Sequence, residues 1–286
     1  MAISAEAQPA SLPLPGGQAN ATVRLHPLLA GEMLAPPGLL ARPPGRLAAA
    51  RMFLGSRSSW IWLPVPAFLI EHPGAGPILV DTGLHPSVAV DPAQNFGRVW
   101  TRLLSIRMSP EQALRDQLRD HGIGHGDVGV VVMTHLHYDH ASGATQFPGA
   151  TFLVERREWG AASSGGLRQG YHRPHLDPSL RWRAIDVEPE ADLFGDGSVR
   201  LLHTPGHTPG HLSLLLRLAG GERLLLTADA AYAQRTLDER LLSLFLDDDD
   251  AYLASLDRLI ALSGDVDHVV CGHDPDGLHR ADSVFG

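Results

Sequence analysis

The heptapeptide THLHYDH, residues 134–140, decides the fold of this chain. It ends a short, β-branched apolar run, VGVVVMT at residues 128–134, which is typical of a strand buried on both faces. Alternate residues of an extended segment point the same way, so His135, His137 and Asp139 project to one side, and His140 follows at once. A lone histidine is usually a surface or capping residue. Four donors packed this tightly behind a buried strand instead predict a site for zinc or a similar metal.

Further metal donors follow other predicted strands, as two complete metal shells require. In HTPGHTPGH the Pro-Gly pairs predict tight turns, and His207 between them is the expected ligand. His211, at the start of the next strand, is expected to contact a ligand rather than to be one. Asp229 in LTAD and His273 in CGHD each end a strand. Together with the heptapeptide these residues predict a two-metal hydrolytic centre.

The remaining pattern predicts a layered α/β fold with the sheets inside. A helix is expected to begin at Ser109-Pro110 and to end near Gly122, and another to cover residues 247–264. The four acids at residues 247–250, at the start of the second helix, are interpreted as capping that helix rather than as a cation site. Residues 1–21 are expected to form a flexible arm, residues 22–286 a single domain, and residues 34–46 an irregular Pro-rich loop. The expected strands are residues 60–72, 76–83, 128–134, 151–155, 198–204, 211–218, 223–229 and 267–273.

Composition excludes several classes of protein. The formal charge of −9 argues against nucleic acid or an anionic membrane as partner. All 23 basic residues are arginine, which excludes a Schiff-base lysine. The N-terminus has no signal-peptide pattern, no apolar run is long enough to span a membrane, and Cys271 is the one cysteine. A cytoplasmic protein is expected.

The heptapeptide, with VDTG before it and TPGHTPGH, AD and GHD after it, resembles the metallo-β-lactamase superfamily. The resemblance implies an αββα sandwich, in which two mixed β-sheets are flanked by helices and hold the metals at one edge. It further implies one metal on His135, His137 and His207, and another on Asp139, His140 and His273. Asp229 would bridge the two metals, and Asp81 of VDTG would orient a ligand histidine.

Within that superfamily, Asp229 followed at +3 by Tyr232 in TADAAY is similar to the N-acyl homoserine lactonases, the quorum-quenching branch. LPVPAFLIEHPGAGPILVDTG and FLVERREW resemble that branch more loosely. Other branches match less well: secreted β-lactamases lack the bridging aspartate, and thioesterases and flavo-diiron enzymes append domains. An arbitrary tyrosine is more often a core aromatic than a catalytic group, but the offset of Tyr232 from a metal ligand favours a role in polarising a carbonyl.

The resemblance implies hydrolysis of the lactone ring by metal-bound hydroxide, with Tyr232 stabilising the oxyanion and Asp139 protonating the leaving oxygen. The expected cofactors are two divalent metal ions, with zinc preferred, and the expected partner is a small-molecule lactone. Residues 33–34, 52–53 and 60–62 are candidates to line an acyl groove, although core or dimer contacts explain them equally well. A homodimer is left open. Another lactone, ester or thioester is the alternative substrate, and a metal-binding protein without turnover is the remote alternative.

Overall fold

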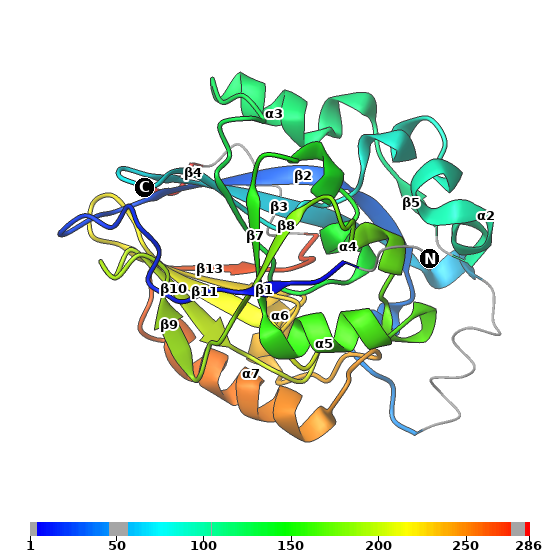
Figure 1. Ribbon diagram of the computed structural model, residues 1–286. Helices are drawn as coiled ribbons and strands as arrows, with labels where there is room; N and C mark the ends of the chain where they lie inside the picture. The colour runs from blue at the N-terminus through cyan, green and yellow to red at the C-terminus, as the bar shows by residue number, and fades with distance from the viewer. Residues whose placement is uncertain (1–4, 46–56, 104, 276–283) are drawn as a thin grey trace.

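The structure, a computed structural model, describes residues 5–45, 57–103, 105–275 and 284–286. Two β-sheets lie face to face between helices (Figure 1). The larger sheet has the order β1-β8-β7-β6-β4-β3-β2-β5, and the smaller has the order β13-β12-β11-β10-β9. The strands of the larger sheet are β1 Gln8–Pro9, β2 Arg24–Ala35, β3 Ile61–His72, β4 Gly76–Val80, β5 Ile106–Arg107, β6 Val130–Val132, β7 Thr151–Glu155 and β8 Arg181–Ile185. Those of the smaller are β9 Glu190–Asp192, β10 Val199–His203, β11 Leu212–Arg217, β12 Arg223–Ala228 and β13 His268–Cys271.

The central strands of the larger sheet bury both of their faces. In β4, Ile78 and Val80 belong to the core between the two sheets, whereas Leu79 belongs to the core on the outer face. β6 repeats this division, with Val132 inside and Val131 outside. Such a period of two with apolar residues on both faces explains why these strands read as unbroken hydrophobic runs.

Helices close both outer faces. Leu118 of α3 and Ala162 of α5 pack in the outer core of the larger sheet. Tyr252 and Leu256 of α7 pack against Leu225 of the smaller sheet. The predicted αββα sandwich with two mixed sheets is therefore confirmed. The helices are α2 Ala93–Leu103, α3 Leu114–Asp120, α4 Tyr138–Ala141, α5 Arg156–Ser164, α6 Gln234–Asp238 and α7 Asp249–Ser263.

The predicted elements differ from the structure mainly at their ends. The helix expected from Ser109 is divided into a 3-10 turn, Pro110–Gln112, and α3, because Ala113 has an extended backbone (ψ 123°). Of the four acids, Asp248 caps α7: its carboxylate accepts a hydrogen bond of 2.9 Å from the Ala251 amide. Asp249 and Asp250 lie in the first turn of the helix. The sequence patterns missed several elements, among them β2, α2 and α6. They also missed β8 and α5, whose segments are rich in arginine and carry little apolar periodicity.

The N-terminal arm, expected to be loose, lies on the domain where the structure describes it. Gln8–Pro9 pairs in parallel with β8. The Leu14 amide donates to the Leu193 carbonyl at 2.8 Å, and the Gln18 amide donates to the Asp196 carboxylate at 2.9 Å. The composition of the arm gave no sign of this, because its order comes from backbone hydrogen bonds that cover the open edge of the larger sheet.

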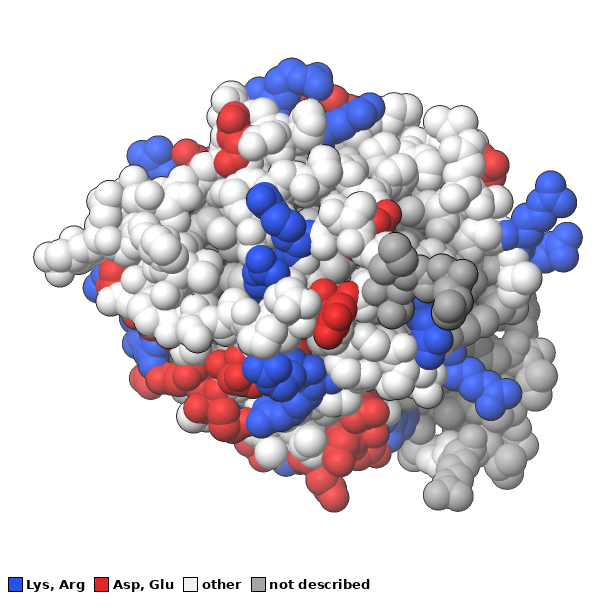
Figure 2. Space-filling model, in the orientation of Figure 1, with Lys and Arg blue, Asp and Glu red and all other residues white. Residues whose placement is uncertain are grey.

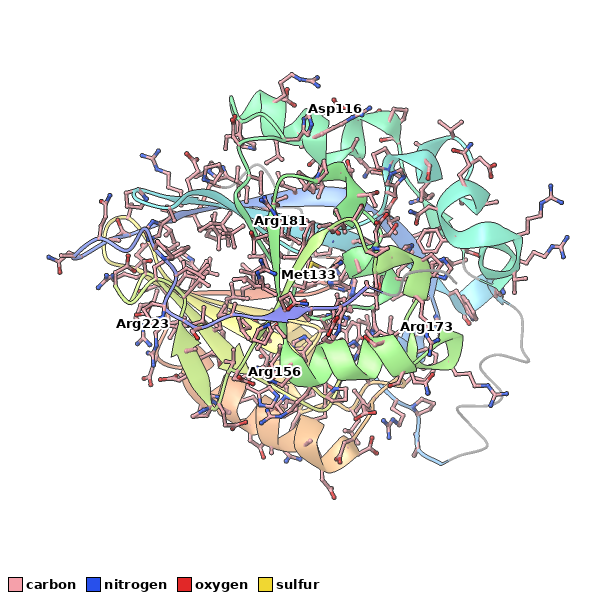
Figure 3. All side chains as sticks on the ribbon, in the orientation of Figure 1. Asp116, Met133, Arg156, Arg173, Arg181 and Arg223 are labelled. Carbon is pink, nitrogen blue, oxygen red and sulfur yellow. The ribbon has the colours of Figure 1, made fainter. Side chains whose placement is uncertain are left out.

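The surface is mixed in charge. On the face in Figure 2, arginine and acidic side chains are interspersed, with the acids gathered toward the lower part, where α7 and β9 lie. Met133 is fully buried in the outer core of the larger sheet, whereas Asp116 and Arg223 lie at the periphery (Figure 3). Among the described residues, no helix is both long and apolar enough to cross a membrane.

Candidate metal centre

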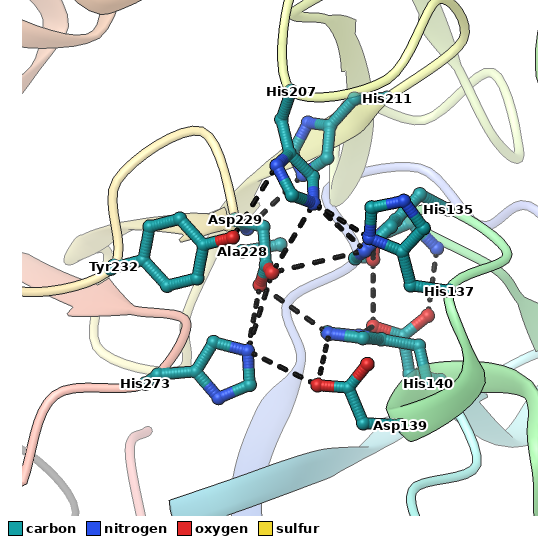
Figure 4. A network of polar contacts seen from close by, with 12 residues as sticks. His135, His137, Asp139, His140, His207, His211, Ala228, Asp229, Tyr232 and His273 are labelled. Carbon is teal, nitrogen blue, oxygen red and sulfur yellow. Dashed lines mark hydrogen bonds and ion pairs between the residues drawn. The ribbon is translucent and has the colours of Figure 1, made fainter. Parts of the chain in front are cut away.

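Four strand ends meet at one edge of the sandwich and bring the predicted metal donors together. The heptapeptide follows β6, and the segment that carries His207 connects β10 to β11. Asp229 and His273 follow β12 and β13, which are paired in parallel and so end at the same edge. Figure 4 shows the side chains converging from these segments. The assembled donors are His135, His137, Asp139, His140, His207, Asp229 and His273.

Three histidines form the first group. Nε2 of His207 lies 3.2 Å from Nε2 of His135 and 3.0 Å from Nδ1 of His137. His135 is fully buried, and burial lowers the pKa of His137 to about 4. All three imidazoles therefore aim a ring nitrogen at one point from which water is largely excluded.

Asp139, His140 and His273 form the second group, and Asp229 lies between the two groups. Nε2 of His273 is 3.6 Å from Oδ2 of Asp139, and Nε2 of His140 is 3.8 Å from the same oxygen. The Asp229 carboxylate is 3.4 Å from His140, 3.2 Å from His273 and 3.4 Å from His207. It thus reaches both groups, as a bridging ligand must.

The donor set fits divalent cations. Nε2 of His140 and Oδ1 of Asp229 are buried and have no hydrogen-bond partner among the described residues. Buried polar atoms are rarely left unpaired, so both call for a missing partner. Burial lowers the pKa of His140, but the nearby carboxylates, Asp229 foremost, more than reverse this and hold it well above its ordinary value. An excess of negative charge beside imidazole nitrogens is the environment that a bound cation neutralises.

Asp81 and His211 are hydrogen-bonded to two of these donor residues. Oδ2 of Asp81 lies 2.7 Å from Nδ1 of His140, and the same carboxylate accepts hydrogen bonds from the Thr134 amide and hydroxyl. An Nδ1–H bonded in this way leaves Nε2 of His140 free to bind a metal. His211 is fully buried and accepts a hydrogen bond of 3.1 Å from the Asp229 amide. Its contact is therefore with the backbone of the bridging aspartate.

Tyr232 stands at the base of a cavity of about 620 Å³. Its hydroxyl lies 3.4 Å from Nδ1 of His207, and its ring stacks on His273. Burial, followed by the charge of Asp229, raises the pKa of Tyr232 well above its ordinary value, so the hydroxyl keeps its proton and remains a donor. The position predicted from the offset to Asp229 thus places a hydrogen-bond donor beside the metal ligands.

The Pro-rich loop contributes to the wall of this cavity. Pro36 and Leu39 line it, and Arg42 fixes the loop by pairing with Asp249. Of the residues expected to line an acyl groove, Met33, Leu34 and Trp60 line the cavity. Trp62 instead packs under the Arg107 guanidinium, 3.9 Å from the ring centroid. Residues 52–53 lie outside the described residues.

Sequence reasoning missed several cavity and support residues. Leu244, Phe245 and Leu246 form part of the cavity wall. Glu158 and Tyr171 are buried beside the histidine loops and hydrogen-bonded to each other at 3.1 Å. The segment FLVERREW, which resembles the lactonase branch, contains Glu158, but nothing in the pattern gave this residue a role, because a glutamate in the first turn of a helix is usually exposed and interacts only with the helix dipole.

Gly206 allows the His207 turn to approach α7. Its φ is +123°, and a Cβ at this position would lie 2.1 Å from the backbone nitrogen of Tyr252. We expect Gly206→Ala to lower the free energy of unfolding by roughly 2–4 kcal/mol, measured by urea denaturation. Gly220→Ala is the matched control, because its φ is +90° and its Cβ would meet open space. Equal losses in the two variants would contradict the role of the close contact.

Comparisons with known proteins agree with this geometry. The sequence model described as the metallo-beta-lactamase superfamily matches residues 60–273. An N-acyl homoserine lactonase AttM of Rhizobium radiobacter is 38% identical over 223 residues, which are 75% of this chain and 83% of the relative. An N-acyl homoserine lactonase of a Bacillus species is 34% identical over 197 residues, 69% of this chain and 75% of the relative.

Solved structures agree as well. An N-acyl homoserine lactone hydrolase, solved with N-hexanoyl-L-homoserine bound at its catalytic metal centre, has a TM-score of 0.73 and 27% identity. The match covers 89% of this chain and 95% of that one. The chain therefore belongs to the metallo-beta-lactamase superfamily, on the branch that contains the N-acyl homoserine lactonases.

Proposed function

We propose that this protein is a metal-dependent hydrolase that opens the lactone ring of N-acyl homoserine lactones. One observation carries the choice of substrate: Tyr232 and Asp229 line the same cavity as a set of apolar side chains. Leu34, Leu39 and Trp60 belong to that set. A polar lactone head with an apolar acyl tail matches such a cavity, since binding sites combine apolar walls with a few placed polar groups.

The proposed metal ligands are the two groups of donors that lie close together in the structure. His135, His137 and His207 would hold one ion, Asp139, His140 and His273 the other, and Asp229 would contact both. Ions bound there would supply a water of lowered pKa as the nucleophile and would polarise the carbonyl as Lewis acids. We propose zinc, because imidazole and carboxylate donors in a buried site suit it.

The side chains carry the remaining steps. The Tyr232 hydroxyl donates a hydrogen bond to the carbonyl oxygen as negative charge develops on it. Asp139 lines the cavity and is buried, so its carboxylate is available to pass a proton to the ring oxygen when the C–O bond breaks. The apolar wall holds the acyl tail and keeps water from the reacting ester. We assign these roles to one catalytic domain, residues 22–286.

Hydrolysis of acyl homoserine lactones is expected to be rapid and sensitive to chelators. In a pH-stat assay, ring opening releases a proton, so acid production on lactones of several acyl lengths reports turnover directly. Removing the metal with a chelator should abolish the rate, and added Zn²⁺ should restore it. Simple lactones, an aryl ester and a thioester serve as comparison substrates.

Two results of this assay would contradict the proposal. Turnover of the thioester or simple ester without turnover of acyl homoserine lactones would move the substrate to a related class. No chelator-sensitive rate on any substrate would leave a metal-binding protein without turnover. A homodimer and a cytoplasmic location remain predictions; the single cysteine, buried and unpaired, supports a reducing compartment.

A further inference from the structure

Glu158 is a fully buried carboxylate outside the set of metal donors. It lies in the first turn of α5. Oε1 accepts hydrogen bonds from the Leu136 amide at 2.9 Å and from the Tyr171 hydroxyl at 3.1 Å. Oε2 accepts from the Gly210 amide at 3.2 Å. Within the described residues no arginine or histidine forms an ion pair with it, so its charge is met by neutral donors alone.

The two amide donors belong to the two loops that carry the first group of ligands. Leu136 separates His135 from His137, and Gly210 lies three residues after His207. One carboxylate therefore connects the two loops whose histidines lie 3.0–3.2 Å apart. The second group is connected less directly. Asp139 and His140 follow Leu136 in the heptapeptide but lie in the helical turn α4, and His273 lies on a segment that donates no hydrogen bond to Glu158 among the described residues.

Close packing accompanies these hydrogen bonds. A Cβ at Gly210 would lie 2.3 Å from the Glu158 backbone nitrogen, so only glycine permits this approach of the loop to α5. On the other side, the Tyr171 ring lies 5.1 Å from the His137 ring, and the two residues form an isolated β-bridge. Helix α5, the two histidine loops and Tyr171 are therefore packed against one another around Glu158.

A carboxylate in this place is costly for folding. Burial raises the pKa of Glu158 to about 7, an effect that hydrogen bonding by the Thr208 side chain and then by the Leu136 and Gly210 amides partly offsets. An apolar side chain would avoid the cost of desolvation. A carboxylate, however, supplies two acceptor oxygens at a fixed separation, which an apolar side chain cannot do.

We propose that Glu158 is a positioning residue that fixes the spacing of the His135–His137 and His207 loops and so sets the affinity of one of the two metal positions. This inference rests on the ligand assignment of the proposed function. Glu158 touches neither ligand side chains nor the cavity, so it acts through the backbone of the loops. Its effect should fall mainly on the three-histidine position, because the second group is reached only through the α4 turn.

The test follows the release of zinc from the loaded protein to a chromogenic chelator. Glutamine keeps the shape of Glu158 but has one acceptor oxygen and one NH₂ group. It can therefore accept a hydrogen bond from the amide of one loop, while its NH₂ group faces the amide N–H of the other loop and cannot accept from it. Leucine accepts a hydrogen bond from neither loop. We expect Glu158→Leu to release one of two zinc ions about 10–100-fold faster than the wild type, with Glu158→Gln in between. Tyr171→Phe, which removes one donor and leaves both loop amides in place, should have the smallest effect.

A control separates positioning from general loss of stability. Leu118→Ala in α3 removes a fully buried side chain from the outer core of the larger sheet, on a helix whose main contacts are with β2 and the Pro110–Gln112 turn and that carries none of the donors to Glu158. Urea unfolding of the metal-free proteins shows how far each variant is destabilised. Leu118→Ala should be destabilised yet release both ions at the wild-type rate. Should the leucine variant fail to fold, the isosteric glutamine carries the comparison.

The outcomes are distinct. Selective, faster release of one ion from Glu158→Gln supports the inference. Wild-type release rates in this variant, or equal acceleration of both ions, overturn it while leaving the proposed function intact. A wild-type chain that binds no zinc overturns the ligand assignment and the inference with it.

Discussion

Asp229→Asn is expected to lower kcat/KM for lactone hydrolysis by about 10³-fold or more, because it removes a carboxylate that reaches both groups of donors. The carboxylate lies 3.2 Å from His273 and 3.4 Å from His207, which belong to different groups. Asparagine keeps the size of the side chain but offers a single neutral oxygen. Steady-state kinetics, with the metal content of the same preparation, measures the effect.

The expected loss should come with a loss of bound metal. Asp257→Asn is the matched control, since Asp257 is exposed and its ion pair with Arg240 lies on the surface at 2.6 Å. Surface pairs of this kind contribute little, so this variant should keep both metal and rate. An Asp229→Asn protein that binds two metals and turns over at the wild-type rate would contradict the bridging role.

The sequence predicted the metal donors well because each lies just past a strand. Period-two alternation holds for His135 and His137 but not for Asp139, because α4 begins at Tyr138 and turns Asp139 and His140 toward the second group. The residues after β12 and β13 follow from the same rule, since parallel strands end at one edge. Donor type and strand position together therefore suffice to locate the site without knowledge of the packing.

Support residues could not be predicted in this way. Glu158 acts through backbone amides of Leu136 and Gly210, and hydrogen bonds to amides leave no pattern in the sequence. The order of the N-terminal arm depends likewise on backbone pairing with β8. Such contacts depend on which loops the fold brings together, and this is decided by tertiary packing rather than by local periodicity.

The wall of the cavity shows the same limit. Leu34 and Trp60 were candidates because they are apolar and close to predicted strands, and they do line the cavity. Trp62, two residues from Trp60, packs under Arg107 instead. Leu244–Leu246 reach the cavity from a segment that precedes α7 and has no predicted element of its own. Apolar character identifies candidate residues, but only the tertiary packing decides which of them line the cavity and which lie on the surface.

Tyr232→Phe is expected to lower kcat on acyl homoserine lactones by about 10²-fold with the metal content unchanged. The hydroxyl is buried and lies 3.4 Å from Nδ1 of His207. The variant removes only the hydroxyl, so both the ring stacked on His273 and the metal ligands stay in place. Steady-state kinetics on lactones, with metal content measured alongside, tests this.

The kinetic pattern separates three roles of Tyr232. A hydrogen bond made only in the transition state requires kcat and kcat/KM to fall equally, whereas one made equally in the ground state raises KM and leaves kcat unchanged. A packing role leaves both constants unchanged and lowers only the stability. Tyr252→Phe is the control, because the Tyr252 hydroxyl is buried and has no hydrogen-bond partner among the described residues. Equal kinetics for the two variants would remove Tyr232 from the mechanism, and with it the feature that favours a lactone over other esters.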